Sequence, residues 1–400
     1  MLAALRNRYF ALLWAGQSLS AVGNRMFPVI LALVVLERGS GAAALGLVLA
    51  AQSAALVAGT LLAAAVTDRF SRRAIMLWTD LVRAVAVAGI TVASDSVLTA
   101  LVVVTAMAEG LFQPAYAAVI PRTLPARHLQ AGNSLTSLSQ YTALVIGPSL
   151  AGAVIATTGT TAALWVDVGT FVASLATLVL VHESSPVETG PRARPWGLGQ
   201  MARDIAEGFR AVRRRGWLAA SMGASMLVMT VTVAPMMLIA PIATDGPRAY
   251  GAAFTALGVG SILGALLTAR LRTSRPGFAA AIGILLVGGA PLSLAALPLP
   301  GVLVLWGTAG VGITVFEVLW TTAVQQDVPD ELLGRVMALD WLGSESCTPL
   351  GYLMAGLAVG QFGTRPLLLV GACVAVLAAP LPLLTRGGAT FSSPAPSSAG

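Results

Sequence analysis

The chain has 400 residues, of which 56% are hydrophobic and only 10% are charged, and its mean hydropathy is +0.83. Water-soluble domains are roughly a quarter charged, so this composition excludes a soluble globular protein and predicts a chain whose solvent is lipid. The net charge of +7 rests on 24 basic residues, all Arg; these lie beside apolar segments and indicate contact with anionic lipid rather than nucleic acid.

Apolar segments of about 20 residues, the length that a helix needs to cross a bilayer core, recur along the whole chain. The first half contains six of them, at residues 10–36, 42–66, 74–94, 97–119, 132–157 and 160–182. The second half contains six more, at residues 217–243, 250–269, 277–297, 301–325, 336–359 and 364–385. The sequence therefore predicts an all-α membrane protein with twelve transmembrane helices in two pseudo-symmetric six-helix bundles.

The arginines orient these helices in the membrane. When successive connections are assigned to alternate sides, Arg38, Arg248 and Arg365 fall on one side, while Arg25 and Arg83 lie inside spans. The remaining nineteen of the 24 basic residues fall on the other side. Because basic residues accumulate on the cytoplasmic side, this asymmetry predicts a multi-pass protein of the cell inner (plasma) membrane with both termini in the cytoplasm.

Only one connection is long enough to form an element of its own. It opens with Ser, Pro and Gly and then places Arg203, Arg210 and Arg213 among apolar residues at helical spacing. This pattern is typical of an amphipathic helix on the membrane surface, whereas the Ser- and Pro-rich C-terminus is typical of disorder. We therefore expect four parts: an N-terminal six-helix bundle (1–182), a cytoplasmic linker with the amphipathic helix (183–216), a C-terminal six-helix bundle (217–385) and a disordered cytoplasmic tail (386–400).

Two six-helix halves joined by a basic linker are typical of secondary transporters, whose substrate cavity lies between the halves at mid-membrane. A channel would need a selectivity filter and an ATP-driven pump a nucleotide-binding sequence, and neither is apparent. The two histidines, His128 and His182, lie near span ends. The sequence therefore predicts neither an enzyme nor a metal or cofactor site, and indicates a monomeric transporter of a small molecule.

Ionisable residues inside spans are costly in lipid, so each is a candidate functional residue. Glu109 lies near the middle of the fourth span, and helical spacing predicts that Phe112, Gln113 and Tyr116 share its face. This stripe could bind an amphipathic ligand and carry a proton. Arg25 in the first span stays charged, so it needs a carboxylate, water or an anionic substrate. A pair in which Arg25 merely neutralises Glu109 is the structural alternative.

The second half supplies further acids for a cavity. Glu317 in the tenth span has Trp320 beside it, and Glu345 in the eleventh span shares a helical face with Trp341. Either carboxyl could bind a coupling proton and compete for it with a cationic substrate. These four residues extend the predicted substrate cavity to the second bundle.

Residues 64–73, between the second and third spans, read Ala-Ala-Val-Thr-Asp-Arg-Phe-Ser-Arg-Arg. This segment resembles the signature loop of the major facilitator superfamily, in which an Asp and the Arg residues after it lock a cytoplasmic gate. Two glycines that are usual in this loop are Ala64 and Ser71 here. The resemblance implies a gate formed by Asp68, Arg69, Arg72 and Arg73.

Other charges are expected near this gate. Asp80 and Arg83 lie at i and i+3 in the third span, where they neutralise each other or join the gate. Asp340, about a turn inside the eleventh span, is expected to be a gate residue or a partner of Arg335 at the helix end. Asp167 in the sixth span is expected to be structural, because the third and sixth spans of each half in this superfamily usually face lipid or support their neighbours.

Two more motifs resemble exporters of this superfamily. The fifth span carries Gly147, Pro148 and Gly152, similar to the motif with which drug antiporters pack helices closely and seal the cavity. Residues 131–135 and 328–336 look like the branch that contains macrolide and siderophore exporters. The resemblance implies the major facilitator fold and the export of small amphipathic or apolar compounds, such as drugs, by proton antiport with alternating access.

Asn24 departs from this pattern, because it stands where many relatives of the exporter branch carry an acid. The departure keeps open an importer or an uncoupled facilitator of a small solute. A membrane receptor that uses a transporter scaffold without transporting is a third hypothesis. A multidrug efflux antiporter is the leading one.

Overall fold

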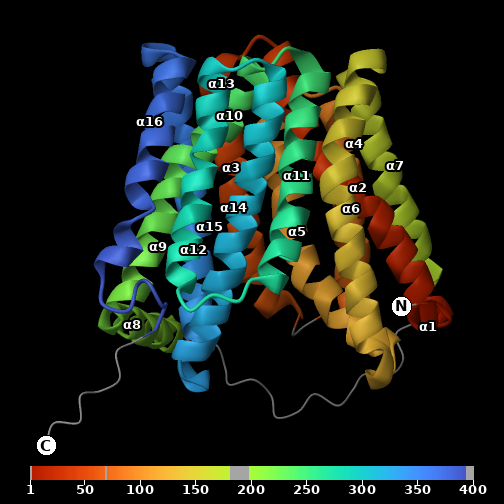
Figure 1. Ribbon diagram of the computed structural model, residues 1–400. Coiled ribbons are helices and arrows are strands. Elements are labelled where there is room, and N and C mark those ends of the chain that lie inside the picture. Colours follow the sequence, from red (N-terminus) through yellow and green to blue (C-terminus); the bar gives the residue numbers. More distant parts are fainter. Residues whose placement is uncertain (1, 68–69, 181–197, 393–400) are drawn as a thin grey trace, which may run out of the picture. The chain divides into compact units, whose positions relative to one another are not determined.

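The computed structural model describes residues 2–67, 70–180 and 198–392, and in these ranges the chain consists of helices and the connections between them, with no strand (Figure 1). It forms two compact units. Unit 1 comprises Met1–Pro191 and Thr244–Thr255, and unit 2 comprises Arg192–Ala243 and Ala256–Gly400. Thr244–Thr255 belongs to unit 1, although we expected it in the C-terminal bundle.

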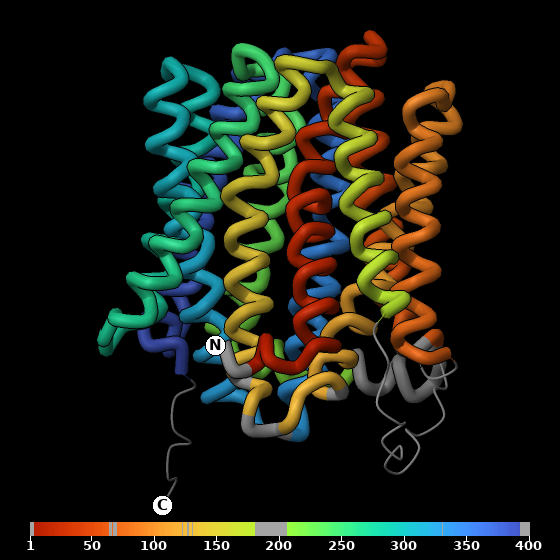
Figure 2. Tube along the Cα trace, turned by 90° about the vertical axis from the view of Figure 1, so that its right-hand side faces the viewer, coloured from red at the N-terminus to blue at the C-terminus, as the bar shows by residue number. Residues whose placement is uncertain are grey.

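The long helices of unit 1 run side by side (Figures 1 and 2). They are α2 (Arg8–Glu37), α3 (Gly41–Thr67), α4 (Arg72–Ile90), α5 (Asp95–Thr123), α6 (Ala126–Thr158) and α7 (Thr160–Leu180), preceded by the short α1 (Leu2–Leu5). Asn7 begins α2 by accepting hydrogen bonds from the backbone amides of Tyr9 and Phe10. Gly159 has a φ of +88°, which only glycine adopts readily, so α6 and α7 are joined by a tight reversal.

Unit 2 begins with the amphipathic helix expected in the linker. Its helices are α8 (Leu198–Arg214), α9 (Gly216–Val228), η1 (Met229–Val233), α10 (Ala234–Ala243), α11 (Gly246–Arg270, which starts in unit 1), α12 (Pro276–Val287), α13 (Gly289–Ala296), α14 (Leu299–Asp327), α15 (Asp330–Phe362), α16 (Thr364–Ala378) and η2 (Leu381–Leu384). The span from α9 to α10 contains a π-helical segment, η1, in which Thr232 donates a 2.7 Å hydrogen bond to the Gly371 carbonyl. Such segments widen a helix and let it bend.

Twelve spans result from these helices. Within the described ranges, ten spans are long and apolar enough to cross a membrane, counting α9 to α10, α12 to α13 and α16 to η2 as one each. The other two are α4 and α15, which carry several charged residues and yet pack among the apolar helices of their units. The predicted fold class, an all-α membrane protein with two bundles of six spans, is therefore confirmed.

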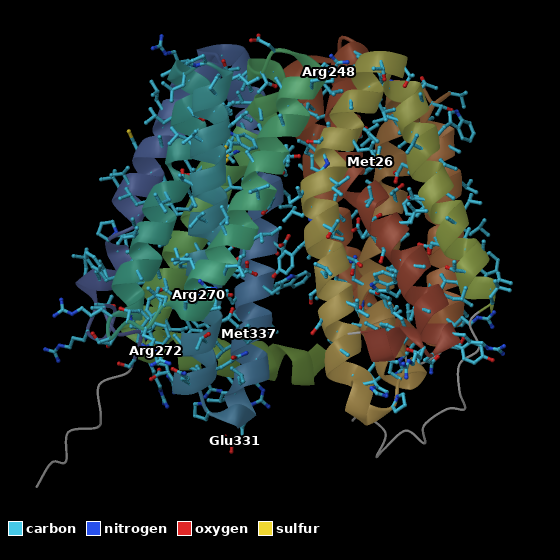
Figure 3. The ribbon with its side chains drawn as sticks, turned by 45° about the vertical axis from the view of Figure 1, so that its right-hand side comes forward. Met26, Arg248, Arg270, Arg272, Glu331 and Met337 are labelled. Atoms are coloured by element: carbon cyan, nitrogen blue, oxygen red, sulfur yellow. The ribbon has the colours of Figure 1, made fainter. Side chains whose placement is uncertain are left out.

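Several arginines lie at the ends of helices. Figure 3 shows Arg248 in the first turn of α11 and Arg270 in its last turn, at opposite ends. At the end of unit 1 that holds the α2–α3 turn, Arg38 donates hydrogen bonds to the carbonyls of Ile90 and Ala93, and its Nη1 lies 3.3 Å from Asp95 Oδ1. Arg38 thus joins the end of α2 to the connection between α4 and α5.

The tail that we expected to be disordered is partly ordered, and that prediction is wrong for residues up to 392. Phe391 is buried, and its ring stacks on Trp217 with the centroids 5.2 Å apart. The backbone amide of Gly277 also donates a 3.0 Å hydrogen bond to the Ala389 carbonyl. Burial of one aromatic ring offsets the entropic cost that the Ser- and Pro-rich composition led us to expect. Residues 393–400 lie outside the described ranges.

Close packing of α3 on α5 fixes the helix that carries Glu109. A Cβ atom added at Gly59 would collide with the carbonyl of Met107, and one added at Gly110 would collide with the carbonyl of Leu56. Small residues let the two backbones touch, as is common between membrane helices. The position of Glu109 is therefore set by its neighbour Gly110.

Candidate functional site

The core of unit 1 contains a cluster of charged and polar side chains where α2, α4 and α7 meet. Asp80 and Asp167 are completely buried, and Arg83 is 1% exposed. These three side chains lie in helices that are otherwise largely apolar. Ionisable groups with so little exposure need partners of opposite charge or hydrogen bonds, since an unpaired buried charge is very costly.

Asp80 and Arg83 on α4 form an ion pair with 3.5 Å between Arg83 Nη1 and Asp80 Oδ1. Arg83 Nη2 also donates a hydrogen bond to the side-chain carbonyl of Asn24 on α2. The hydroxyl of Ser174 on α7 donates a 2.6 Å hydrogen bond to Asp80 Oδ2, and Gln17 on α2 donates a 2.7 Å bond to Ser174 Oγ. One polar network therefore connects three helices.

Aromatic rings hold the guanidinium of Arg83 in place. Its Cζ atom lies 4.3 Å from the ring centroid of Phe171 on α7 and 5.7 Å from that of Phe112 on α5. A guanidinium over a ring face gains electrostatic attraction, more so away from water. Arg83 is thus positioned by contacts from four helices.

Asp167 is the functional candidate that sequence reasoning placed among structural residues. Its Oδ2 atom has no hydrogen-bond partner in the described part of the chain, and its Oδ1 atom lies 3.5 Å from Thr170 Oγ1. The carboxyl interacts electrostatically with Arg83 and Glu109. The signal that could have identified it was present in the sequence: an acid in the middle of an apolar span.

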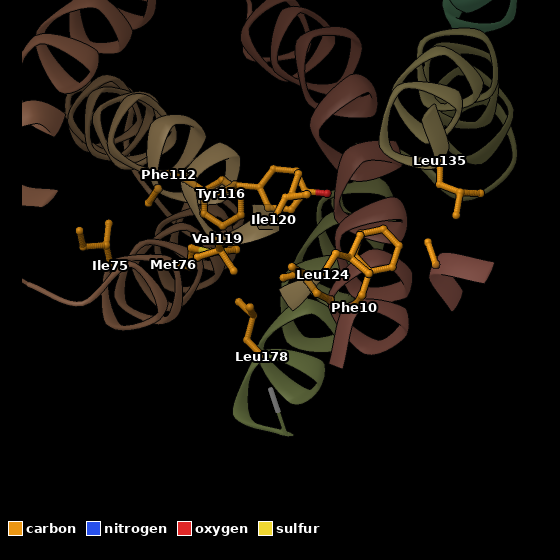
Figure 4. Close-up of a cluster of buried hydrophobic side chains, with 13 residues drawn as sticks. Phe10, Ile75, Met76, Phe112, Tyr116, Val119, Ile120, Leu124, Leu135 and Leu178 are labelled. Atoms are coloured by element: carbon orange, nitrogen blue, oxygen red, sulfur yellow. The ribbon is translucent and has the colours of Figure 1, made fainter. Parts of the chain in front are cut away.

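The predicted ligand-binding stripe on α5 is divided by the fold. Phe112 and Tyr116 are buried in the hydrophobic core of unit 1 with residues of α2, α4 and α7, as Figure 4 shows. Their rings stack with centroids 6.0 Å apart. Gln113 is exposed and Glu109 is half-buried. The boundary of the core runs along this face of α5, so the acid and the amide lie at the edge of the core while the two aromatics lie inside it.

Arg25 does not pair with Glu109 in the structure. The Arg25 side chain is exposed, and among the described residues it has neither an ion pair nor a hydrogen bond. Glu109 interacts electrostatically with a second acid, Asp167, and this interaction is repulsive when both carboxyls are ionised. The Arg25 backbone lies against α6, since a Cβ added at Gly147 would meet Arg25 Cβ. The predicted contact of Arg25 with a substrate stays a prediction.

Gly147, Pro148 and Gly152 lie where α6 packs closely on other segments of unit 1. A Cβ at Gly152 would collide with the Pro247 carbonyl, and one at Gly251 would collide with that of Pro148. Beside this contact, Thr255 Oγ1 donates a 2.7 Å hydrogen bond to the Val145 carbonyl. These contacts attach the first turns of α11 to α6.

Two of the predicted gate residues, Asp68 and Arg69, lie outside the described ranges. Arg73 donates hydrogen bonds from Nε to the Leu178 carbonyl at 3.0 Å and from Nη2 to the Val179 carbonyl at 2.6 Å. These carbonyls belong to the last turn of α7, where a cation is favourable. Arg72 is half-buried at the start of α4. The gate formed by these four residues stays a prediction.

Asp80 and Arg83, which we also considered for the gate, lie deeper. Asp80 follows Arg72 by eight residues, so it is about 12 Å along α4 from the start of the helix. The predicted i, i+3 pairing is present, and complete burial gives the pair a position inside the bundle.

In unit 2, Arg335 and Asp340, which we expected to pair on α15, each contact another residue. Arg335 Nη1 lies 2.6 Å from Glu207 Oε2 on α8, which fastens the amphipathic helix to α15. Asp340 Oδ2 accepts a 3.1 Å hydrogen bond from Trp320 Nε1. Trp320 itself is buried and packs edge to face on Trp217, with the centroids 5.8 Å apart. Trp320 therefore belongs to the core of unit 2.

The remaining acids of unit 2 are more accessible. Glu317 is exposed, Glu345 is half-buried, and Trp341 is 37% exposed. Glu345 interacts electrostatically with Tyr352, two turns further along α15. Within the described ranges no group of three or more His, Cys, Asp or Glu side chains could hold a metal ion.

Residues 13–345 match the family model described as Major Facilitator Superfamily. The chain belongs to this superfamily. It is 28% identical over 390 residues to the multidrug efflux pump Tap of Mycobacterium tuberculosis, covering 92% of this chain and 91% of that protein. It is 29% identical over 365 residues to Tap of Mycolicibacterium fortuitum, covering 87% of each chain. This member of the major facilitator superfamily is therefore a multi-pass membrane transporter with efflux pumps among its relatives.

Solved structures of other transporters share the fold. The nucleoside transporter NupG superposes with a TM-score of 0.76 at 13% identity, covering 94% of this chain and 99% of that one. The peptide transporter POT in complex with sulfate superposes with a TM-score of 0.74 at 11% identity, covering 94% of each chain. At such low identities the likeness concerns the fold alone.

Proposed function

We propose that this transporter exports small amphipathic or apolar compounds, such as drugs, in exchange for protons. The observation that carries the proposal is the similarity to relatives named as multidrug efflux pumps, which extends over 92% of the chain. Buried and half-buried acids in unit 1 supply groups that can hold protons. The chain is monomeric in this proposal.

We propose that Glu109 is the acid that binds the substrate. It is half-buried at the edge of the core of unit 1, and Gln113, one turn away, is exposed on the same helix. A carboxylate here attracts a cationic amphipathic compound, while its electrostatic interaction with Asp167 makes substrate binding sensitive to the charge inside the bundle. Glu317 and Glu345 are the corresponding candidates in unit 2.

The arginine distribution supports an orientation with both termini in the cytoplasm of a cell whose inner (plasma) membrane holds the protein. Nineteen Arg belong to the connections that we assign to the cytoplasm, against Arg38, Arg248 and Arg365 on the other side. Export is then movement away from the side that carries α8. Reconstitution with a protease-accessible tag at either terminus measures this orientation.

Purified protein in liposomes tests the proposal. Ethidium, a fluorescent amphipathic cation, is the probe, and an imposed pH gradient is the only energy source. Antiport requires that ethidium accumulates against its own gradient and that the accumulation collapses when a protonophore is added. If ethidium moved only down its own gradient, the result would contradict antiport and indicate an uncoupled facilitator or importer.

A receptor built on this scaffold gives a third result. It would bind ethidium or another ligand, as measured by thermal stabilisation of the purified protein, without moving it across the bilayer in either direction. Binding without transport would therefore overturn the transport step of the proposal and leave the fold unaffected.

Asp68→Asn tests the predicted cytoplasmic gate. Neutralising the acid removes its attraction for helix N-termini and for the arginines of the loop, so we expect the inward-open state to gain population. The measurement is the labelling rate of single cysteines introduced on the cytoplasmic side of the spans, expected to rise several-fold. Asp95→Asn at the opposite end of unit 1 is the control, and equal labelling of Asp68→Asn and wild type would contradict the gate.

A further inference from the structure

The cluster around Arg83 contains more acid than base. In the described core of unit 1, one guanidinium, that of Arg83, pairs with the buried carboxyl of Asp80 and interacts electrostatically with the buried carboxyl of Asp167. Glu109 adds a third carboxyl whose charge reaches Asp167. An uncompensated charge inside a helix bundle is strongly unfavourable, so one of the two buried carboxyls must carry a proton.

Hydrogen bonds identify which carboxyl that is. Asp80 accepts a 2.6 Å hydrogen bond from Ser174 and pairs with Arg83, and both contacts stabilise a carboxylate. Asp167 receives no comparable support: Oδ1 is 3.5 Å from Thr170 Oγ1, and Oδ2 has no partner among the residues described. Asp80 is therefore the ionised acid of the pair, and the proton belongs to Asp167.

We propose that Asp167 is the site that binds and releases the coupling proton, and that Arg83 transmits its charge state to α2 through Asn24. The inference rests on the proton antiport proposed above, since a proton that never left Asp167 would have only a structural role. It assigns proton binding to α7, and leaves Glu109 to interact with the substrate.

The step is a proton transfer in which no other covalent bond changes. When the proton leaves Asp167 Oδ2 for water, the new carboxylate attracts the Arg83 guanidinium, and Asp80 keeps the hydrogen bond from Ser174. Arg83 then loosens its hydrogen bond to Asn24. Since a Cβ at Gly23 would collide with Asp167 Oδ1, α2 lies directly against this carboxyl and responds to the change. Rebinding of a proton reverses each movement.

The charged groups near Asp167 come from two helices. Arg83 and Asp80 belong to α4, which packs on α7, and Glu109 acts from α5. On α2, the other helix in extensive contact with α7, Arg25 is exposed. On α6, the described ionisable group nearest to the level of Asp167 is Tyr141. Its side chain is exposed and lies about 15 Å further along the helix axis.

Infrared difference spectra test whether the proton is there and leaves. Spectra of reconstituted wild-type protein, recorded between the free and the ethidium-bound state, should show the loss of a C=O stretch of a protonated carboxylic acid. The band should be missing in Asp167→Asn and shifted in Asp167→Glu, which keeps the carboxyl. A band that is unchanged by ethidium, or that persists in Asp167→Asn, overturns the assignment.

Transport by the same variants separates coupling from folding. Asp167→Asn should lower pH-driven uphill accumulation of ethidium at least tenfold and leave its downhill counterflow measurable. Asp167→Glu should recover part of the uphill transport. Asp95→Asn, which alters an exposed acid that pairs with Arg38, is the control and should transport as wild type does.

The transport measurements distinguish a failure of the proposed antiport from a failure of the assignment of Asp167. Wild-type protein without any uphill transport would overturn the proposed antiport, whatever Asp167 does. Uphill transport at the wild-type rate in Asp167→Asn would overturn the assignment of Asp167 and leave antiport intact. Asp167→Asn could lose counterflow as well as uphill transport. In that case, uphill transport by Asp167→Glu would support the proposal. If Asp167→Glu showed no uphill transport and ethidium left the infrared band of the wild type unchanged, the proposal would be overturned.

Discussion

Replacing Arg83 by Gln is expected to destabilise unit 1 by about 3 to 5 kcal/mol, the cost of removing one partner from a buried ion pair. Arg83 is 1% exposed and provides the positive charge that faces Asp80, while its guanidinium also bonds Asn24 and covers the ring of Phe171. Its loss leaves a buried carboxylate without a counter-ion. Thermal or denaturant unfolding of the purified protein in detergent measures the effect.

A second substitution identifies the cause of that loss. Arg83→Gln combined with Asp80→Asn removes both charges, so the double variant should be clearly more stable than Arg83→Gln alone. Arg270→Gln at the exposed end of α11 is the matched control, with a change below about 0.5 kcal/mol. If Arg83→Gln unfolded like this control, the cluster would not need the charge of Arg83.

Replacing Glu109 by Gln is expected to reduce uphill export of ethidium at least tenfold, which corresponds to about 1.4 kcal/mol or more in transition-state stabilisation. The half-buried carboxylate is the acid that we assign to the cationic substrate, and the amide keeps its shape without its charge. The KM for ethidium should rise, because attraction of the cation is lost. Initial rates in liposomes at several ethidium concentrations give both quantities.

Two comparisons make this prediction specific. An uncharged amphipathic compound should be exported by Glu109→Gln much more nearly at the wild-type rate, since no ionic attraction is lost. Glu331→Gln, a change of an exposed acid at the start of α15, should alter neither substrate (Figure 3). Equal uphill export of ethidium by Glu109→Gln and wild type would exclude Glu109 from recognition and from coupling.

Local sequence information was sufficient for the helices. The predicted span 10–36 is α2 (Arg8–Glu37) in the structure, and the predicted span 364–385 is α16 with η2 (Thr364–Leu384). A bilayer demands about 20 apolar residues per crossing, so the signal for each span is contained within the span itself. The contact between Asp80 and Arg83 is equally local, since residues three apart meet on one helix.

Helical spacing predicted less well which side of each helix is buried. It placed Phe112, Tyr116 and Glu109 on one stripe, and the fold then buried the two aromatics and left the acid at the edge of the core. A stripe read from the sequence has an uncertain width, because the neighbouring helices decide which part of it is covered. Trp320 shows the same effect in unit 2, where it packs on Trp217 and bonds Asp340.

The sequence by itself determined a polytopic membrane protein, the positions of its spans and the residues whose charge is out of place in lipid. Only the tertiary structure decided which of those charges meet. Ser174 and Asp80 are 94 residues apart and share a 2.6 Å hydrogen bond, and the carboxyl of Asp167 on α7 interacts electrostatically with Arg83 on α4 and Glu109 on α5. Hydropathy is a property of each segment, whereas the pairing of buried charges depends on how helices distant in sequence pack against one another.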